Sequence, residues 1–358
     1  MITTAGASKS IGCFLREYQM YRVDIGMDLG TSKVSIYMRD KGIVINQPAV
    51  IAYERKSRKI IAVGTKAKKM IGKTDDSIVV ELPIRRGVIS QYSLAERMIK
   101  AFVKNALRKR RLFGRPNICV TIPMDISEVE RNAVLSAVEK LGARGRQLIS
   151  APIAAAIGSG VDVMEASGHM IVDIGGGTTE IAIISAGDVV IGESMKLGGD
   201  DFTEALSRYV RRKYNVLLGD LSAEDAKIEA GAVMIRANDV TYEIKGRNVM
   251  TGLPVKVELS SNETVEAMSE LANQIADRAL HIIDKADPDV VSDIAEEGIM
   301  LSGGGSLIYG MERLIAERTG VKVIPSAEPM NVLAAGAGMA GKYISYLEAE
   351  KRQNDIDN

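Results

Sequence analysis

Two short segments of the chain share one arrangement of aspartate, glycine and hydroxyl residues: 26–37 (GMDLGTSKVSIY) and 171–184 (IVDIGGGTTEIAII). In each, an apolar strand ends in an aspartate, a glycine turn carrying hydroxyls follows, and the next strand alternates small or polar with apolar residues. This pattern is typical of a β-hairpin. Glycine turns let backbone N–H groups approach an anion, so the sequence predicts a phosphate-binding hairpin used twice.

The paired aspartates, Asp28 and Asp173, favour this hypothesis over two tight hairpins whose glycines only satisfy turn geometry, because neither aspartate has an evident folding role. They would face each other across the phosphates and hold a hydrated Mg²⁺ through water, since this ion prefers a few carboxylates and retained waters. The glycines and hydroxyls expected around the phosphates are Gly30, Thr31, Ser32, Gly175, Gly176, Gly177 and Thr178.

A third glycine-rich turn lies in residues 298–310 (GIMLSGGGSLIYG), where a strand leads into a turn and then a helix. Backbone N–H groups of such a turn can bind phosphate or flank a nucleobase. The residues concerned are Gly303, Gly304, Gly305 and Ser306.

The composition is that of an ordinary globular protein. The 358 residues exceed the usual size of a single core, so two domains or one deeply lobed body are expected. A hydrophobic content of 46% and a formal net charge of zero exclude a global attraction to nucleic acid. Two cysteines and two histidines are too few for a disulfide framework or a usual zinc site, which favours a reducing cytoplasm.

The first nineteen residues carry no strong strand or turn pattern, and no apolar run is long enough to cross a bilayer. We interpret residues 1–19 as an N-terminal extension or the result of a start codon chosen too early. Alternatively, one helix face contacts membrane, formed by Ile11, Phe14, Leu15 and Tyr18.

Alternating strands and helices are expected after the first hairpin. Residues 20–65 read as mostly antiparallel sheet, with helices at 93–109 and 126–141 on either side of a buried strand at 118–123. Further helices are expected at 201–214, 223–233 and 265–284, with a strand-rich stretch at 240–259.

This order of elements resembles the actin, sugar-kinase and heat-shock-chaperone ATPase superfamily, and within it the MreB family. The resemblance rests on DIGMDLGTS, KGIVINQPAVIA, MIGKT, GVISQY, VDIGGGTTE, TGLP, LSGGGSL and EP followed by AAGAGM, between residues 20 and about 345. It implies an α/β actin-like ATPase fold: two duplicated α/β halves around a nucleotide cleft, each with a small subdomain. The first half would comprise 20–51, 85–164 and 334–358, with 52–84 as its subdomain, and the second 165–200 and 265–333, with 201–264.

The resemblance also implies ATP and Mg²⁺ as cofactors and assigns roles to residues. The two hairpins match the family's phosphate loops, and Gly303 to Ser306 match its adenosine loop. Glu224 and Lys227 match residues that contact ribose and base, although a solvated i, i+3 pair is the alternative. Asp200 is a further cleft candidate, or else the N-cap of the following helix.

One departure from the family concerns hydrolysis. MreB proteins usually carry Glu-Glu-Pro before the AAAIG helix, and the second glutamate resembles the residue that positions the attacking water; this chain has Ser150-Ala151-Pro152. A methyl group cannot orient or deprotonate water, so we expect nucleotide binding with slow hydrolysis. Thr178, Thr179 or Glu180 are the residues that can partly substitute.

A cationic and apolar run, RKRRLF (residues 108–113), begins at the end of the helix expected at 93–109. Arg108, Arg110 and Arg111 beside Leu112 and Phe113 suit insertion at an anionic lipid surface, each cation adding about 1 kcal/mol. The alternative is a helix C-terminus with favourable cations and a core-bound Leu-Phe pair. In MreB the corresponding loop faces membrane.

The resemblance implies a membrane-associated filament that organises cell-wall synthesis and rod shape. The partners would be further copies of the chain in head-to-tail protofilaments paired antiparallel, an anionic membrane surface, and cell-wall elongation and morphogenetic proteins, without nucleic acid. The expected location is the cytoplasm, at the inner face of the cell membrane. The alternatives are a small-molecule kinase on the same fold, which would need a sugar pocket, and a regulatory paralogue that co-assembles with little ATP turnover, which Ala151 favours.

Overall fold

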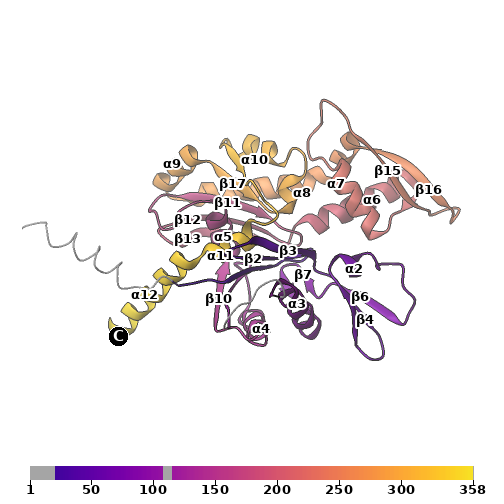
Figure 1. Ribbon diagram of the computed structural model, residues 1–358. Coiled ribbons are helices and arrows are strands. Elements are labelled where there is room, and N and C mark those ends of the chain that lie inside the picture. Colours follow the sequence, from indigo (N-terminus) through magenta and orange to yellow (C-terminus); the bar gives the residue numbers. More distant parts are fainter. Residues whose placement is uncertain (1–20, 108–114, 358) are drawn as a thin grey trace, which may run out of the picture.

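Two five-stranded sheets with the same topology form the centre of the molecule (Figure 1). The computed structural model describes residues 21–107 and 115–357. In each sheet an antiparallel three-stranded meander is extended by two parallel strands beside its first strand. The first sheet has the order β10-β9-β1-β2-β3: β1 (Ile25–Leu29), β2 (Lys33–Met38), β3 (Gly42–Pro48), β9 (Asn117–Ile122) and β10 (Gly145–Ser150). The second has the order β13-β12-β11-β17-β18: β11 (His169–Ile174), β12 (Thr179–Ser185), β13 (Asp188–Met195), β17 (Ile299–Ser302) and β18 (Val323–Pro325).

Two helices rich in small residues lie between the sheets, α5 (Ala151–Gly158) and α11 (Val332–Met339). A side chain at Gly336 would come within 1.8 Å of the Ala154 carbonyl oxygen, so the two helix backbones are in direct contact. Helices α3 (Tyr92–Leu107) and α4 (Glu128–Glu139) pack together at the first sheet, and α12 (Gly341–Asp357) ends the chain. Among the described helices, none combines the length and apolar character needed to cross a membrane.

A small sheet extends from each half on the same side of the molecule (Figure 1). The first contains β4 (Ile51–Glu54), β5 (Ile60–Val63) and β6 (Ile78–Glu81) with α2 (Thr65–Lys68), and the ribbon β7 (Ile84–Arg85) and β8 (Val88–Ile89) follows it. The second contains β14 (Val216–Leu217), β15 (Thr241–Asn248) and β16 (Pro254–Ser260), accompanied by α6 (Gly199–Tyr214) and α7 (Asp220–Ala230). The remaining elements are α8 (Ser261–Lys285), α9 (Pro288–Glu297), η1 (Gly304–Leu307) and α10 (Met311–Thr319).

Helix α8 begins at Ser261, whereas the sequence pattern predicts its start at residue 265. The earlier start has a physical cause, a capping box in which the Glu263 carboxylate accepts a hydrogen bond from the Ser260 N–H at 2.9 Å. Asp239 accepts a further bond from the Asn262 N–H at 3.0 Å. Helix α7 likewise ends at Ala230, before the predicted residue 233, because Gly231 is its C-cap.

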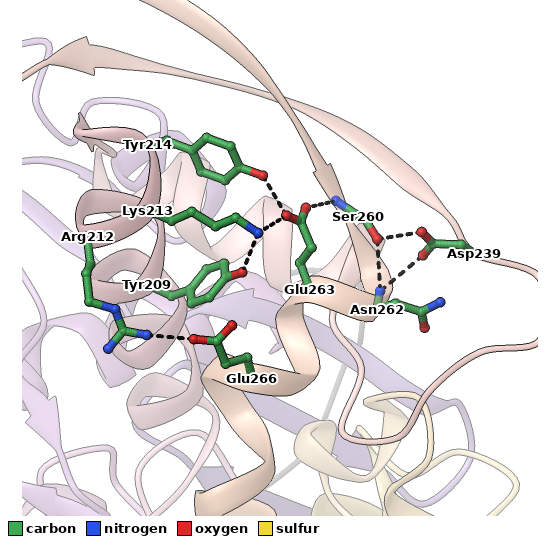
Figure 2. Close-up of polar contacts among 9 residues, drawn as sticks. All are labelled: Tyr209, Arg212, Lys213, Tyr214, Asp239, Ser260, Asn262, Glu263 and Glu266. Carbon is green, nitrogen blue, oxygen red and sulfur yellow. Dashed lines mark hydrogen bonds and ion pairs between the residues drawn. The ribbon is translucent and has the colours of Figure 1, made fainter.

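The same glutamate joins α8 to the end of α6 (Figure 2). Glu263 accepts a hydrogen bond from the Tyr214 hydroxyl at 2.7 Å and pairs with the Lys213 amine, which also donates to the Tyr209 hydroxyl at 3.0 Å. Because α6 begins beside the second hairpin turn, these bonds connect that turn to the start of α8 through one continuous helix.

Candidate functional site

The two hairpin turns and the third glycine-rich turn line one cleft of about 280 Å³. Ala151 and Glu180 also line the cleft. The predicted binding residues that line it are Asp28, Gly30, Thr31, Ser32, Asp173, Gly175, Gly176, Gly177, Thr178, Glu224, Lys227, Gly303, Gly304 and Gly305. Three predicted residues lie beside it without lining it: Thr179, Asp200 and Ser306.

Each cleft aspartate is held by a hydroxyl from the neighbouring parallel strand. The register places Asp28 beside Thr121 of β9 and Asp173 beside Ser302 of β17. The Thr121 hydroxyl donates to Asp28 Oδ1 at 3.0 Å, and the Ser302 hydroxyl donates to Asp173 Oδ1. The sequence pattern did not identify these two hydroxyls as site residues, although each lies near the end of the buried strand that pairs with a hairpin.

Burial raises the pKa of both aspartates. For Asp173 the pKa rises to about 7, and the nearby carboxylates Asp28 and Glu180 raise it further while the Ser302 hydrogen bond and Lys33 act in the opposite direction. Several carboxyl groups are therefore gathered where the ionised form is unfavourable. A cation bound between them would relieve this cost.

The two hairpin turns meet across the cleft. The Ser32 hydroxyl donates to Asp200 Oδ1 at 3.1 Å, and the Gly87 N–H donates to Thr31 Oγ1 at 2.8 Å. A Cβ atom at Gly177 would lie 2.5 Å from Thr31 Oγ1 and 2.8 Å from the Arg86 Cα atom. The absence of a side chain at Gly177 is thus a condition for this close approach.

Replacing Gly177 with alanine is expected to lower the affinity for a phosphorylated ligand at least about tenfold, because backbone at Arg86 must move to accept the methyl group. Titration with ATP measures the change. The matched control is Gly219→Ala, where a Cβ atom would meet no neighbour within 4 Å. Equal ATP affinity for both variants and the unaltered chain would contradict the expected need for close approach.

Asp200 lies inside α6 and joins the two hairpins. Its N–H donates to the Gly176 carbonyl at 2.8 Å while its carboxylate accepts from Ser32. The N-cap of α6 is Gly198, whose N–H donates to Asp201 Oδ2 at 2.9 Å. The N-cap alternative for Asp200 is therefore wrong, because the helix starts earlier than residue 201.

Glu224 and Lys227 form an ion pair at the edge of the cleft, with the lysine buried and the glutamate partly exposed. Their charged groups are 2.7 Å apart, and the Lys227 amine also donates to the Gly199 carbonyl at 2.9 Å. The lysine is only 9% exposed, so the alternative of a solvated helical pair is wrong. Ile228 and Leu307 line the same cleft and are more than half exposed, at 64% and 62%. These aliphatic side chains provide an apolar surface for a flat ring.

Of the three residues that were expected to replace the missing glutamate, Thr179 is excluded by its position. It is fully buried, and its hydroxyl donates to the Leu197 carbonyl at 2.8 Å. Glu180 lines the cleft, but its two carboxylate oxygens accept from the Ser194 hydroxyl at 2.8 Å and the Met124 N–H at 3.2 Å. Burial also raises the pKa of Glu180. Thr178 lines the cleft.

The chain is similar to known proteins over most of its length. The family model of the MreB/Mbl protein matches residues 22–349. The cell shape-determining protein Mbl of Bacillus cereus is 40% identical over 328 residues, covering 92% of this chain and 98% of the relative. The cell shape-determining protein MreB of Escherichia coli K12 is 38% identical over 325 residues, covering 90% and 94%.

Solved structures have the same fold. MreB5 of Spiroplasma citri bound to ADP matches with a TM-score of 0.84 at 30% identity, covering 91% of this chain and 98% of that one. The MamK double helical filament matches with a TM-score of 0.73 at 20% identity, covering 88% and 97%. These matches confirm the predicted actin-like ATPase fold. From its sequence and its fold, the chain belongs to the MreB/Mbl family.

Proposed function

We propose that the chain binds ATP in the cleft and assembles into filaments in response. One observation carries the proposal: two glycine turns line the same cleft, and each follows an aspartate whose carboxylate accepts a hydrogen bond from a hydroxyl of the neighbouring strand. The phosphates would lie between the turns, the ribose near Glu224, and the base against Ile228 and Leu307. The similar MreB5 of Spiroplasma citri binds ADP and AMPPNP, which supports this assignment.

The carboxylates fit Mg²⁺. Asp28 and Asp173 both line the cleft, and within the described residues no three potential ligands cluster closely enough to form a full protein cage. Two carboxylates with retained water are the ligands that Mg²⁺ prefers. The ion would neutralise phosphate charge, while Thr121 and Ser302 hold the two carboxylates in place.

Hydrolysis is proposed to be slow. Ala151 offers only a methyl group at the cleft, and both oxygens of Glu180 already accept hydrogen bonds. Among the residues expected to replace the missing glutamate, Thr178 therefore remains in the described cleft, and a threonine hydroxyl is a poor base. The lack of a general base also favours a second candidate function, that of a paralogue that co-assembles with another family member and turns over little nucleotide.

Self-association is the expected output of nucleotide binding. The structural relative MamK forms a double helical filament, and relatives named Mbl and MreB are cell shape-determining proteins. We propose head-to-tail protofilaments at the inner face of the cell membrane, acting with cell-wall elongation and morphogenetic proteins. The division into two halves and two small subdomains would let nucleotide binding set the angle between contact surfaces.

Sedimentation of the full chain with ATP, ADP and a non-hydrolysable analogue tests this function. We expect pelleting with ATP and with the analogue, and less with ADP, because the γ-phosphate would hold the two hairpins together. A pellet that forms only when a second family member is added would support the co-assembling paralogue. Failure to pellet under every condition, with bound ATP, would contradict both filament proposals.

The residues of the proposed membrane contact lie outside the described part of the chain: Arg108, Arg110, Arg111, Leu112 and Phe113. The alternative N-terminal helix face also lies outside it. Replacing Leu112 and Phe113 together with serine is expected to reduce co-sedimentation with anionic vesicles about tenfold or more, because two apolar side chains that would insert into the bilayer are lost. The control is Leu253→Ser, an exposed leucine near the tip of the β15–β16 hairpin. Unchanged vesicle binding by the double variant would contradict the contact.

A further inference from the structure

Lys33 is a buried cation in the cleft that the proposed chemistry leaves without a role. It is the first residue of β2, directly after the first hairpin turn, and it lines the cleft. Its Nζ atom is buried and has no hydrogen-bond partner among the described residues. Burying an ammonium group without a hydrogen-bond partner costs folding free energy. The presence of Lys33 at this position therefore points to a partner that the protein alone does not supply.

The sheet geometry places this amine beside the carboxylates. Asp28 on β1 pairs with Ser35 on β2, and Lys33 lies two residues before Ser35, hence on the same face of the strand. In the described structure, Nζ forms no hydrogen bond with Asp28 or Asp173. Burial lowers the pKa of Lys33, while Asp28 and Asp173 act in the opposite direction.

The second hairpin has no lysine at the position that corresponds to Lys33. Counted from its aspartate, the second hairpin carries Thr178 where the first carries Lys33, and Glu180 where the first carries Ser35. The other lysine of the cleft, Lys227, is already bound to Glu224 and the Gly199 carbonyl. Among the described residues that line the cleft, Lys33 is thus the one cation whose charged group has no partner.

We propose that Lys33 binds the phosphate chain of the nucleotide through Nζ and supplies part of the charge neutralisation that Mg²⁺ would otherwise supply alone. This inference rests on the proposed nucleotide function. An ammonium donates up to three hydrogen bonds and is a point charge suited to phosphate oxygens. Binding of ATP should therefore be weakened, but retained, when divalent cations are removed.

The test compares the full chain with Lys33→Met, which keeps the length of the side chain and removes its charge. Affinities for ATP, ADP and adenosine are measured by calorimetry, with Mg²⁺ and with EDTA. For ATP we expect an affinity loss of about 10- to 100-fold, the range for hydrogen bonds to charged groups, and a larger loss in EDTA. Adenosine affinity should not change, because adenosine has no phosphate. Lys41→Met, in the exposed turn between β2 and β3, is the control.

A structural role for Lys33 gives a different result. If its charge only offsets Asp28 and Asp173, Lys33→Met should destabilise the nucleotide-free chain, whereas a phosphate ligand predicts a thermal midpoint that is unchanged or higher. Equal ATP affinities for Lys33→Met and the unaltered chain would overturn the inference while leaving nucleotide binding intact. Absence of ATP binding by the unaltered chain would overturn both.

Discussion

Replacing Ala151 with glutamate is expected to raise the single-turnover rate of phosphate release from bound ATP about 100-fold, the lower range of general-base catalysis. Ala151 begins α5 and lines the cleft, so a longer side chain at this position would extend into the cleft. The carboxylate of the introduced glutamate would orient the attacking water and accept its proton. The methyl group of Ala151 does neither, and both oxygens of Glu180 already accept hydrogen bonds.

A matched glutamine variant separates the two contributions. Ala151→Gln has nearly the same size and can orient water, but it does not accept a proton at neutral pH. We expect a rate between those of the unaltered chain and Ala151→Glu. Brisk phosphate release by the unaltered chain would show that Ala151 does not limit hydrolysis. An Ala151→Glu variant that binds ATP normally and gains no rate would contradict the role assigned to this position.

Replacing Asp173 with asparagine is expected to stabilise the nucleotide-free chain and to remove most of its further stabilisation by Mg²⁺ and ATP. The pKa of Asp173 is about 7 in the folded chain, above its ordinary value of 3.8, so the folded state loses stability as the pH rises between these values. A shift of this size corresponds to at most about 4 kcal/mol above pH 7. Asparagine removes the cost and still accepts the Ser302 hydrogen bond.

Urea unfolding at pH 5 and pH 8, with and without Mg²⁺ and ATP, measures both effects. The gain for Asp173→Asn should be larger at pH 8 than at pH 5, because the carboxyl is then ionised in the unaltered chain. Saturating ATP should add about 3 kcal/mol to the unaltered chain at 100 times the dissociation constant, and much less to the variant. The exposed Asp225→Asn is the control. A destabilised variant, or one that ATP stabilises normally, would contradict the role of Asp173.

The sequence was sufficient for the parts of the site that are local in the chain. Asp28 and its glycine turn form one hairpin, and Asp173 and its turn form another, so periodicity and turn residues could predict both. Their similarity extends to two sheets of one topology, because each hairpin is extended by its own pair of parallel strands, β9 and β10 in the first sheet and β17 and β18 in the second.

Contacts between distant segments could not be predicted in this way. Thr121 lies 93 residues from Asp28 and Ser302 lies 129 residues from Asp173, and parallel pairing alone brings them together. The burial of Lys227 depends on the Gly199 carbonyl of another helix, which a helical i, i+3 spacing does not reveal. The limits of the two halves and of their two small subdomains stay a prediction.

Calorimetric titration of the full chain with ATP in Mg²⁺ tests most directly whether the cleft between the duplicated sheets is a nucleotide site. We expect saturable binding of one ATP per chain, weaker binding of adenosine, and a lower ATP affinity for Gly177→Ala but not for Gly219→Ala. No saturable binding, or equal affinities for ATP and adenosine, would contradict the assignment of the two hairpins to phosphate.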